Sequence, residues 1–81
     1  MPKLWEYNGY KFFFFSNEGT PREPRHVHVR KGVQVAKFWL DSTVSVASSF
    51  GMSARELNML EKLVEEKNDY FRRKWDEYFY A

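Results

Sequence analysis

Two histidines, His26 and His28, lie two residues apart within the stretch Pro21–Gly32, and each is followed by a valine. On a β-strand, residues two apart point to the same side, so we expect both imidazoles and Arg30 to share one face. Imidazole titrates near neutral pH and can give or take a proton, while neighbouring cations can hold a phosphate. These are the residue types that metal-free cleavage of RNA requires. His26 and His28 are therefore the candidate catalytic residues.

The positive charge of the chain is concentrated around these histidines. The net charge is only +2, but residues 20–41 carry five basic and two acidic side chains. A local basic patch favours an anionic partner such as RNA. The candidate anion-binding residues are the nearby cations, together with one aromatic ring on which a base could stack: Arg25, Arg30, Lys37 and Trp39. The same pattern is also typical of an ordinary polar sheet face, and the sequence leaves both interpretations open.

A metal site would need one or two ligands in addition to the two imidazoles. The chain has no cysteine and no third histidine, so carboxylates from Glu18, Glu23 or Asp41 would have to complete the site. Nothing in the sequence brings these carboxylates to the histidines. The chain also lacks a glycine-rich phosphate loop and a dinucleotide-binding fingerprint. We therefore expect neither a metal nor a cofactor.

The elements that position these residues begin with a predicted hairpin. Asn8-Gly9 favours a tight turn between the strands Leu4–Tyr7 and Tyr10–Phe15, because both central residues of such a turn need a positive φ. The run Phe12–Phe15 does not alternate, so two of its rings must face each side of the sheet. Either both faces of this strand are covered, or one pair of rings forms an exposed patch.

A second hairpin is expected to carry the histidines. A two-residue loop at Lys31-Gly32 would pair His28 with Val35 and His26 with Lys37, and paired residues share a face. One face is then mostly apolar: Val27, Val29, Gln34, Ala36, Phe38 and Leu40. The other face carries the candidate site: His26, His28, Arg30, Val33, Val35, Lys37 and Trp39. A one-residue slip would exchange the two faces. The stretch Thr43–Ser49 can add a further short strand.

A long C-terminal helix is predicted from about residue 54 to residue 79. Ser53 and Glu56 form a capping box, and Met52 with Leu57 forms a hydrophobic staple around it. No proline or glycine follows, and the apolar residues gather in one sector of the helix. Asn68 falls in the middle of this sector, where it marks a bend, a frayed end or a polar contact.

These elements predict one α+β domain over residues 1–81. An antiparallel sheet of about four strands, within residues 3–48, packs on the C-terminal helix. The longest apolar run has four residues, so we expect neither a signal peptide nor a membrane span. The absence of cysteine fits a cytoplasmic location. The helix is longer than a small sheet needs, which indicates a protein partner or a second copy of the chain.

Four motifs of the chain resemble a family of short bacterial proteins known as domain of unknown function 4160. They are an aromatic strand before Ser-Asn-Glu, a Pro-x-His-Val-His-Val element, a Lys-Phe-Trp-Leu strand and a Ser-x-Arg-Glu-Leu helix start: Phe12–Glu18, Pro24–Val29, Lys37–Leu40 and Ser53–Leu57. Members often have proline where this chain has Arg25. The family has no established activity, but its genes tend to lie beside that of another small protein, in pairs that look like toxin–antitoxin modules.

The resemblance implies that this chain is the toxin-like component of such a gene pair, with an antitoxin-like neighbour as its partner. Together with the basic face, it predicts action on RNA or another phosphate-bearing target, and the enzymatic form of this hypothesis is a metal-independent, ribonuclease-like activity. The alternative is a non-catalytic interaction module. Such a module would use Phe12–Phe15 or the long helix to bind a second copy or a neighbouring-gene protein.

Overall fold

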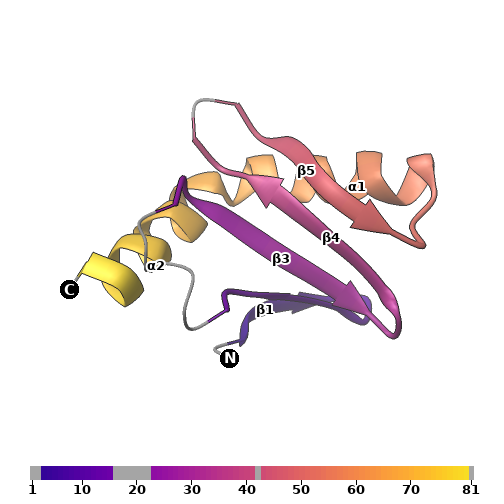
Figure 1. Cartoon of the computed structure of the whole chain (residues 1–81), viewed down its shortest axis with the longest axis horizontal. Coiled ribbons are helices and arrows are strands. Elements are labelled where there is room, and N and C mark those ends of the chain that lie inside the picture. The colour runs from indigo at the N-terminus through magenta and orange to yellow at the C-terminus, as the bar shows by residue number, and fades with distance from the viewer. Residues whose placement is uncertain (1–2, 16–22, 42, 81) are drawn as a thin grey trace.

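The structure is a computed structural model that describes residues 3–15, 23–41 and 43–80. Five antiparallel strands form one sheet in chain order, and two helices follow (Figure 1): β1 (Lys3–Tyr7), β2 (Tyr10–Phe13), β3 (His26–Lys31), β4 (Gln34–Trp39), β5 (Ser45–Phe50), α1 (Ala54–Glu66) and α2 (Asn68–Tyr80). The predicted α+β class is confirmed. The sheet has one strand more than the four expected, and the helix is divided into two.

The first hairpin forms where Asn8-Gly9 predicted it. Both residues have positive φ, 48° and 83°, as the tight hairpin turn requires. β2 ends at Phe13, two residues earlier than predicted. Its run of rings is divided between the two sides of the sheet, because Phe12 packs on Phe71 of α2 and Phe13 packs on His28.

The second hairpin turns at Gly32-Val33, one residue later than predicted. The predicted register is therefore wrong by two residues: His28 pairs with Lys37, and His26 pairs with Trp39. Gly32 adopts a φ of 61°, which glycine takes without steric penalty. Because side chains alternate with a period of two, this shift leaves every residue on its predicted face.

β5 is a full edge strand with one irregularity. Phe38 pairs with Val46, but the preceding residue Lys37 pairs with Ser48, so Ala47 is an extra residue. Such a bulge changes the phase of the alternation along one strand. As a result, Ser48 shares the face of Lys37, and further along the strand Phe50 pairs with Val35.

α1 begins as the capping box predicted. Ser53 Oγ accepts from the Glu56 backbone N–H at 3.1 Å, and Glu56 Oε1 accepts from the Ser53 N–H at 3.0 Å. The helix predicted over about residues 54–79 is divided into two, because it breaks at Lys67 (φ −107°, ψ 19°). With its amide oriented to satisfy both of its groups, Asn68 donates to the Leu40 carbonyl at 3.2 Å. A bend and a polar contact therefore coincide at Asn68.

The helices cover one side of the sheet. α1 lies behind β4 and β5 in Figure 1, and α2 lies near the start of β3. The core between them is closed by the apolar face predicted for the second hairpin and by residues of both helices: Phe12, Phe14, Val27, Val29, Ala36, Phe38, Leu40, Leu60, Val64, Phe71 and Trp75. Within the described residues, neither helix has the length and apolar character needed to cross a membrane.

Candidate functional site

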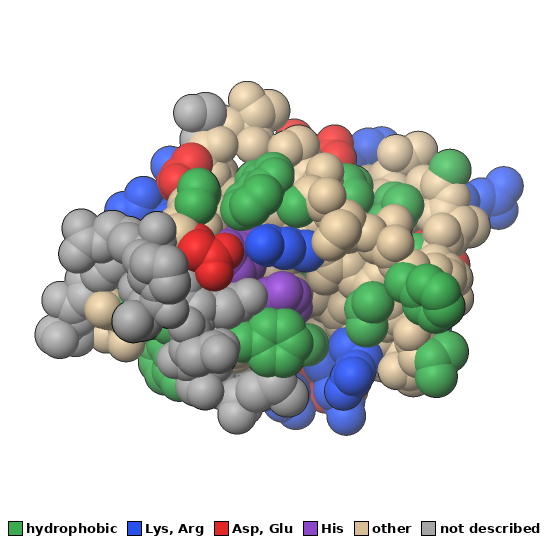
Figure 2. All heavy atoms as spheres, in the orientation of Figure 1, with side chains coloured by type: hydrophobic (Ala, Val, Ile, Leu, Met, Phe, Trp, Pro, Cys, Tyr) green, Lys and Arg blue, Asp and Glu red, His purple; other side chains and the backbone are tan. Residues whose placement is uncertain are grey.

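The side of the sheet opposite α1 carries ordered rows of paired side chains, which we call the open face. The register places one row across all five strands, named the histidine row: Lys3, Phe13, His28, Lys37 and Ser48. A neighbouring arginine row also crosses all five strands: Glu6, Lys11, Arg30, Val35 and Phe50. The rows lie about 7 Å apart, since two strand residues rise by that distance. Figure 2 shows histidine, basic and hydrophobic side chains gathered on this face.

A groove of about 260 Å³ is hollowed into the open face across β2 to β5. Its charged and titratable walls are three of the predicted site residues: His28, Arg30 and Lys37. Rings and hydroxyls complete the lining: Phe13, Phe15, Ser48, Ser49 and Phe50. The structure thus brings half of the six predicted residues into one place. Aromatic side chains lie at both ends of the groove: Phe13 and Phe15 at the β2 end, and Phe50 at the β5 end.

His28 lies half-buried at the aromatic end of the groove. Its ring stacks on Phe13, with centroids 5.6 Å apart, and meets Phe15 edge-on at 4.3 Å. Phe12 and Phe14 are fully buried on the other side, whereas Phe15 keeps 38% of its surface exposed. The structure combines the two arrangements expected for this run of rings. Phe12 and Phe14 are covered by the helices, and of the outer pair Phe13 is buried while Phe15 is exposed.

Lys37 lines the groove, and Trp39 lies next to it on β4, two residues closer to the start of β3. The Lys37 ammonium lies 3.8 Å from the Glu23 carboxylate and 4.6 Å from the centroid of the Trp39 ring. A cation over an aromatic face is attracted by the electrons of the ring. Trp39 therefore lies beside the groove under Lys37, and it does not line the groove itself. A base could stack on Trp39 only after this ammonium moved.

Arg30 connects the groove to a second hollow of about 320 Å³. Its lining residues are Lys3, Lys11, Phe13 and Arg30. Lys3, Lys11 and the rings Phe13, Phe15 and Phe50 were missed in the sequence. The signal for two of them was present, because extending the alternation from β3 to its neighbour β2 would have placed Lys11 and Phe13 beside Arg30 and His28.

His26 lies in a different environment from His28. Its ring is fully buried and packs 4.8 Å from the Trp75 ring of α2. Nδ1 lies 2.8 Å from the Pro24 carbonyl and must donate to it, because a carbonyl only accepts. The sequence led us to expect two exposed imidazoles, but α2 closes over the start of β3. Only His28 borders the groove.

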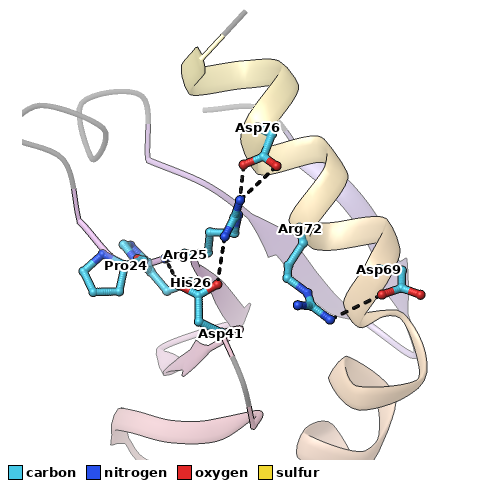
Figure 3. A network of polar contacts seen from close by, with 7 residues as sticks. All are labelled: Pro24, Arg25, His26, Asp41, Asp69, Arg72 and Asp76. Atoms are coloured by element: carbon cyan, nitrogen blue, oxygen red, sulfur yellow. Dashed lines mark hydrogen bonds and ion pairs between the residues drawn. The ribbon is translucent and has the colours of Figure 1, made fainter.

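Arg25 points away from the groove, as the residue next to His26 on an extended chain must. Its guanidinium donates twice to Asp76 of α2, at 2.9 and 3.0 Å, and once to Asp41 at 3.0 Å (Figure 3). The bonds to Asp76, and secondarily those to Asp41, raise the pKa of Arg25. Two carboxylates thus already neutralise this cation. In this arrangement Arg25 connects the start of β3 to α2 and offers no charge to an external anion.

Within the described residues, carboxylates do not converge on the imidazoles. Among residues 3–15, 23–41 and 43–80, no group of three His, Asp or Glu side chains is placed to hold a metal ion. Glu23 forms an ion pair with Lys37, and Asp41 forms one with Arg25. Glu18 lies outside the described residues.

The fold and this surface define a class: a small α+β domain whose five-stranded antiparallel sheet is covered by two helices on one side and grooved on the other. The chain belongs to the family described as Domain of unknown function (DUF4160), which matches residues 9–76. The family resemblance noted in the sequence is thereby confirmed. The match includes the whole groove and most of α2, and it leaves out β1. No curated protein and no solved structure matches this chain.

Proposed function

We propose that this protein binds single-stranded RNA in the groove of the open face, as the toxin-like component of a two-gene module. The observation that carries the proposal is the lining of the groove: imidazole, guanidinium and ammonium groups on adjacent strands between aromatic rings. Cations attract the phosphates, and aromatic rings stack the bases. The toxin-like role rests on the family resemblance, whereas the RNA ligand rests on the groove.

Single strands fit this groove better than duplexes. Its rings can act only on bases whose faces are accessible, and a duplex hides those faces in its own stack. The rings at the two ends are both accessible, because Phe15 is 38% exposed and Phe50 is 68% exposed. They flank the cations of the two central strands, so a phosphate between two stacked bases matches the order of the groups.

Five of the lining residues have a role in this proposal. Arg30 and Lys37 hold phosphate, Phe15 and Phe50 stack bases, and His28 is the candidate for proton transfer. Cleavage of RNA would need both a base and an acid. The His26 ring lies 5.2 Å from the His28 ring, but it is fully buried and does not line the groove. Within the groove lining, the second titratable group is therefore Lys37. The proposal is therefore binding first, with cleavage as a further property of the same groove.

The test is RNA binding by the double variant Arg30→Gln, Lys37→Gln. Fluorescence anisotropy with a labelled oligouridine at ~50 mM salt provides the readout, since phosphate binding is strongest at low salt. We expect the affinity to fall by about tenfold or more, and the slope of its salt dependence to decrease by about 0.7 for each phosphate that the variant no longer neutralises. Lys62→Gln is the matched control, because Lys62 is an exposed cation on α1. Absence of binding by the unmodified protein, or an equal loss in the control, overturns the proposal.

The alternative, a non-catalytic interaction module, is favoured by a different observation. The surfaces first expected to bind a partner are partly buried, since Phe12, Phe14 and the core-facing residues of both helices are internal, while Phe15 and Tyr78 are exposed. Large apolar side chains are also exposed at the far end of the sheet, on Val33 and Phe50. A dimer that forms through this end and is abolished by Phe50→Lys, in a protein that ignores RNA at low salt, would support the module over the RNA-binding protein.

A further inference from the structure

We infer that the hollow beside the groove is a second phosphate subsite, so that the ligand is an RNA chain with several phosphates and not a mononucleotide. This inference rests on the proposed function and deepens it. The subsite is formed by Lys3 and Lys11 with the two residues that it shares with the groove, Phe13 and Arg30.

The groove and the second hollow are adjacent and share two lining residues, so together they form one surface track for a chain-like ligand. Phe13 and Arg30 line both the groove of about 260 Å³ and the second hollow of about 320 Å³. A ligand that lies against Arg30 in the groove is therefore already at the wall of the second hollow. A chain can pass from one to the other along the surface of β2 and β3.

The cations follow the same track. Four successive strands each contribute one basic side chain to the open face: Lys3 on β1, Lys11 on β2, Arg30 on β3 and Lys37 on β4. Neighbouring strands lie about 4.8 Å apart, so the series extends over roughly 14 Å. A nucleoside monophosphate carries its charge at one end and can satisfy only part of such a series. A chain presents phosphates at intervals and can satisfy all of it.

The pairing of Lys11 with Arg30 provides an independent argument. These two cations lie directly opposite each other on β2 and β3, and like charges in that position destabilise a sheet. Glu6 lies opposite Lys11 on the other side, but its carboxylate pairs with Lys3 at 3.0 Å. In the described part of the chain, no carboxylate forms an ion pair with Lys11 or Arg30. A bound phosphate would relieve this repulsion. The nearby pair of Lys3 with Glu6 is exposed on both sides, and such surface pairs are weak enough to yield to a ligand.

The experiment compares ligand lengths in two variants. Uridine monophosphate and oligouridines of two, four and eight nucleotides are titrated against the intact protein, Lys11→Gln and Arg30→Gln. We expect Lys11→Gln to weaken the octamer about three- to tenfold and to leave the monophosphate unchanged, whereas Arg30→Gln weakens both. Lys62→Gln again serves as the matched control. Lys11 is exposed, and its replacement removes both the like-charge pairing with Arg30 and the opposite-charge pairing with Glu6. A circular dichroism melt of Lys11→Gln should therefore stay close to that of the parent.

The outcomes separate the inference from the proposed function. If no ligand of any length binds to the unmodified protein, the RNA-binding proposal fails and the subsite fails with it. If RNA binds but the octamer is no tighter than the monophosphate, or Lys11→Gln changes neither affinity nor salt dependence, only the second subsite is overturned. A length-dependent affinity that Lys11→Gln removes supports both.

Discussion

At the start of β3, His26 is enclosed by Trp75 of α2, whereas His28, two residues later, borders an open groove and meets the exposed ring of Phe15. The two residues have the same type, the same strand and the same phase of alternation. Their surroundings differ because α2 reaches only the first of them. Alternation therefore fixes the side of a sheet on which a residue lies, and elements far along the chain determine whether that residue meets solvent.

The closed end of β3 is held by two kinds of contact. Apolar packing joins Trp75 to Phe14 and Phe79, with ring centroids 5.2 and 4.2 Å apart. Polar contacts join Arg25 to Asp76 on the same helix. No residue of either helix lines the groove at the other, open end of the sheet, and its rings and cations border the groove. If this contrast is right, substitutions at the closed end change stability, and substitutions at the open end change binding.

The largest effect is expected from Trp75→Ala at the closed end. Removing a fully buried large aromatic side chain leaves a cavity and should lower the free energy of unfolding by about 3–5 kcal/mol. That is a large share of the ~5–15 kcal/mol typical of a whole domain. Urea unfolding followed by circular dichroism measures it. Tyr78→Ala on the same helix is the control, and its half-exposed ring should contribute about 1 kcal/mol or less. Equal losses in both variants would contradict the packing described for α2.

The next effect compares the two histidines directly. His26→Ala should lower the free energy of unfolding by about 2–3 kcal/mol, because it empties a buried site against Trp75. RNA affinity should be unchanged at temperatures where the variant is folded. His28→Ala should show the reverse, with a decrease in stability of about 1 kcal/mol or less. Its RNA-binding free energy should weaken by up to about 1–3 kcal/mol, the range for one base–aromatic stack, because the imidazole packs against the Phe15 ring on which a base would stack.

Each histidine variant is the control for the other. Urea unfolding and oligouridine anisotropy are measured on both variants, so that stability and RNA affinity can be compared for each histidine. A His26→Ala protein that stays equally stable and yet loses RNA binding would restore the site with two working imidazoles that the sequence suggested. It would also mean that the start of β3 opens in solution.

A smaller effect is expected from the ion pair that fastens α2. Arg25 and Asp76 are bonded through two parallel hydrogen bonds, but their side chains are 33% and 43% exposed. Solvent screening therefore limits the pair to a coupling free energy of about 0.5–1.5 kcal/mol. A double-mutant cycle with Arg25→Ala and Asp76→Ala measures that coupling. RNA affinity should be the same in the parent, in both single variants and in the double variant. A loss of RNA affinity in Arg25→Ala but not in Asp76→Ala would mean that Arg25 binds the anion after all.

Local signals in the sequence predicted most of the elements, and non-local contacts explain what they missed. The turn at Asn8-Gly9 and the capping box at Ser53–Glu56 are determined by neighbouring residues alone, so the first turn and the start of α1 were placed correctly. The second turn was displaced by one residue because both Lys31-Gly32 and Gly32-Val33 provide a glycine. The break at Lys67 lies beside a hydrogen bond between Asn68 and the Leu40 carbonyl, and this long-range contact cannot be read from a helical pattern.

The same division applies to the candidate site. His28, Arg30 and Lys37 were found because their own strands alternate, and the groove unites them. Arg25 was assigned to an anion because its charge was visible while its partner Asp76 lay in a distant helix. The exposure of His26 was expected for the same reason. Charge and periodicity can be read from a segment, but neutralisation and burial belong to the assembled fold.

The smallest effect concerns Glu56, which joins α1 to the strands below the open end. Its carboxylate accepts the Ser53 backbone N–H and the Tyr10 hydroxyl, at 3.0 and 2.7 Å. These bonds, the first above all, lower the pKa of Glu56 from its ordinary value of 4.5. A lowered pKa in the folded state stabilises the protein above that ordinary value, and the contribution disappears as the pH falls through the folded pKa.

Glu56→Gln should therefore be less stable than the parent at about pH 7, and the difference should shrink towards about pH 3. Urea midpoints at the two pH values test this, with Glu65→Gln, an exposed position on the same helix, as the control. Because Glu56 lies on the helix side of the sheet, oligouridine affinity should stay constant in the variant. If the difference in stability between Glu56→Gln and the parent does not change with pH, the charged Glu56 carboxylate does not stabilise the attachment of α1. A change in RNA affinity would mean that the two sides of the sheet are coupled at this end as well.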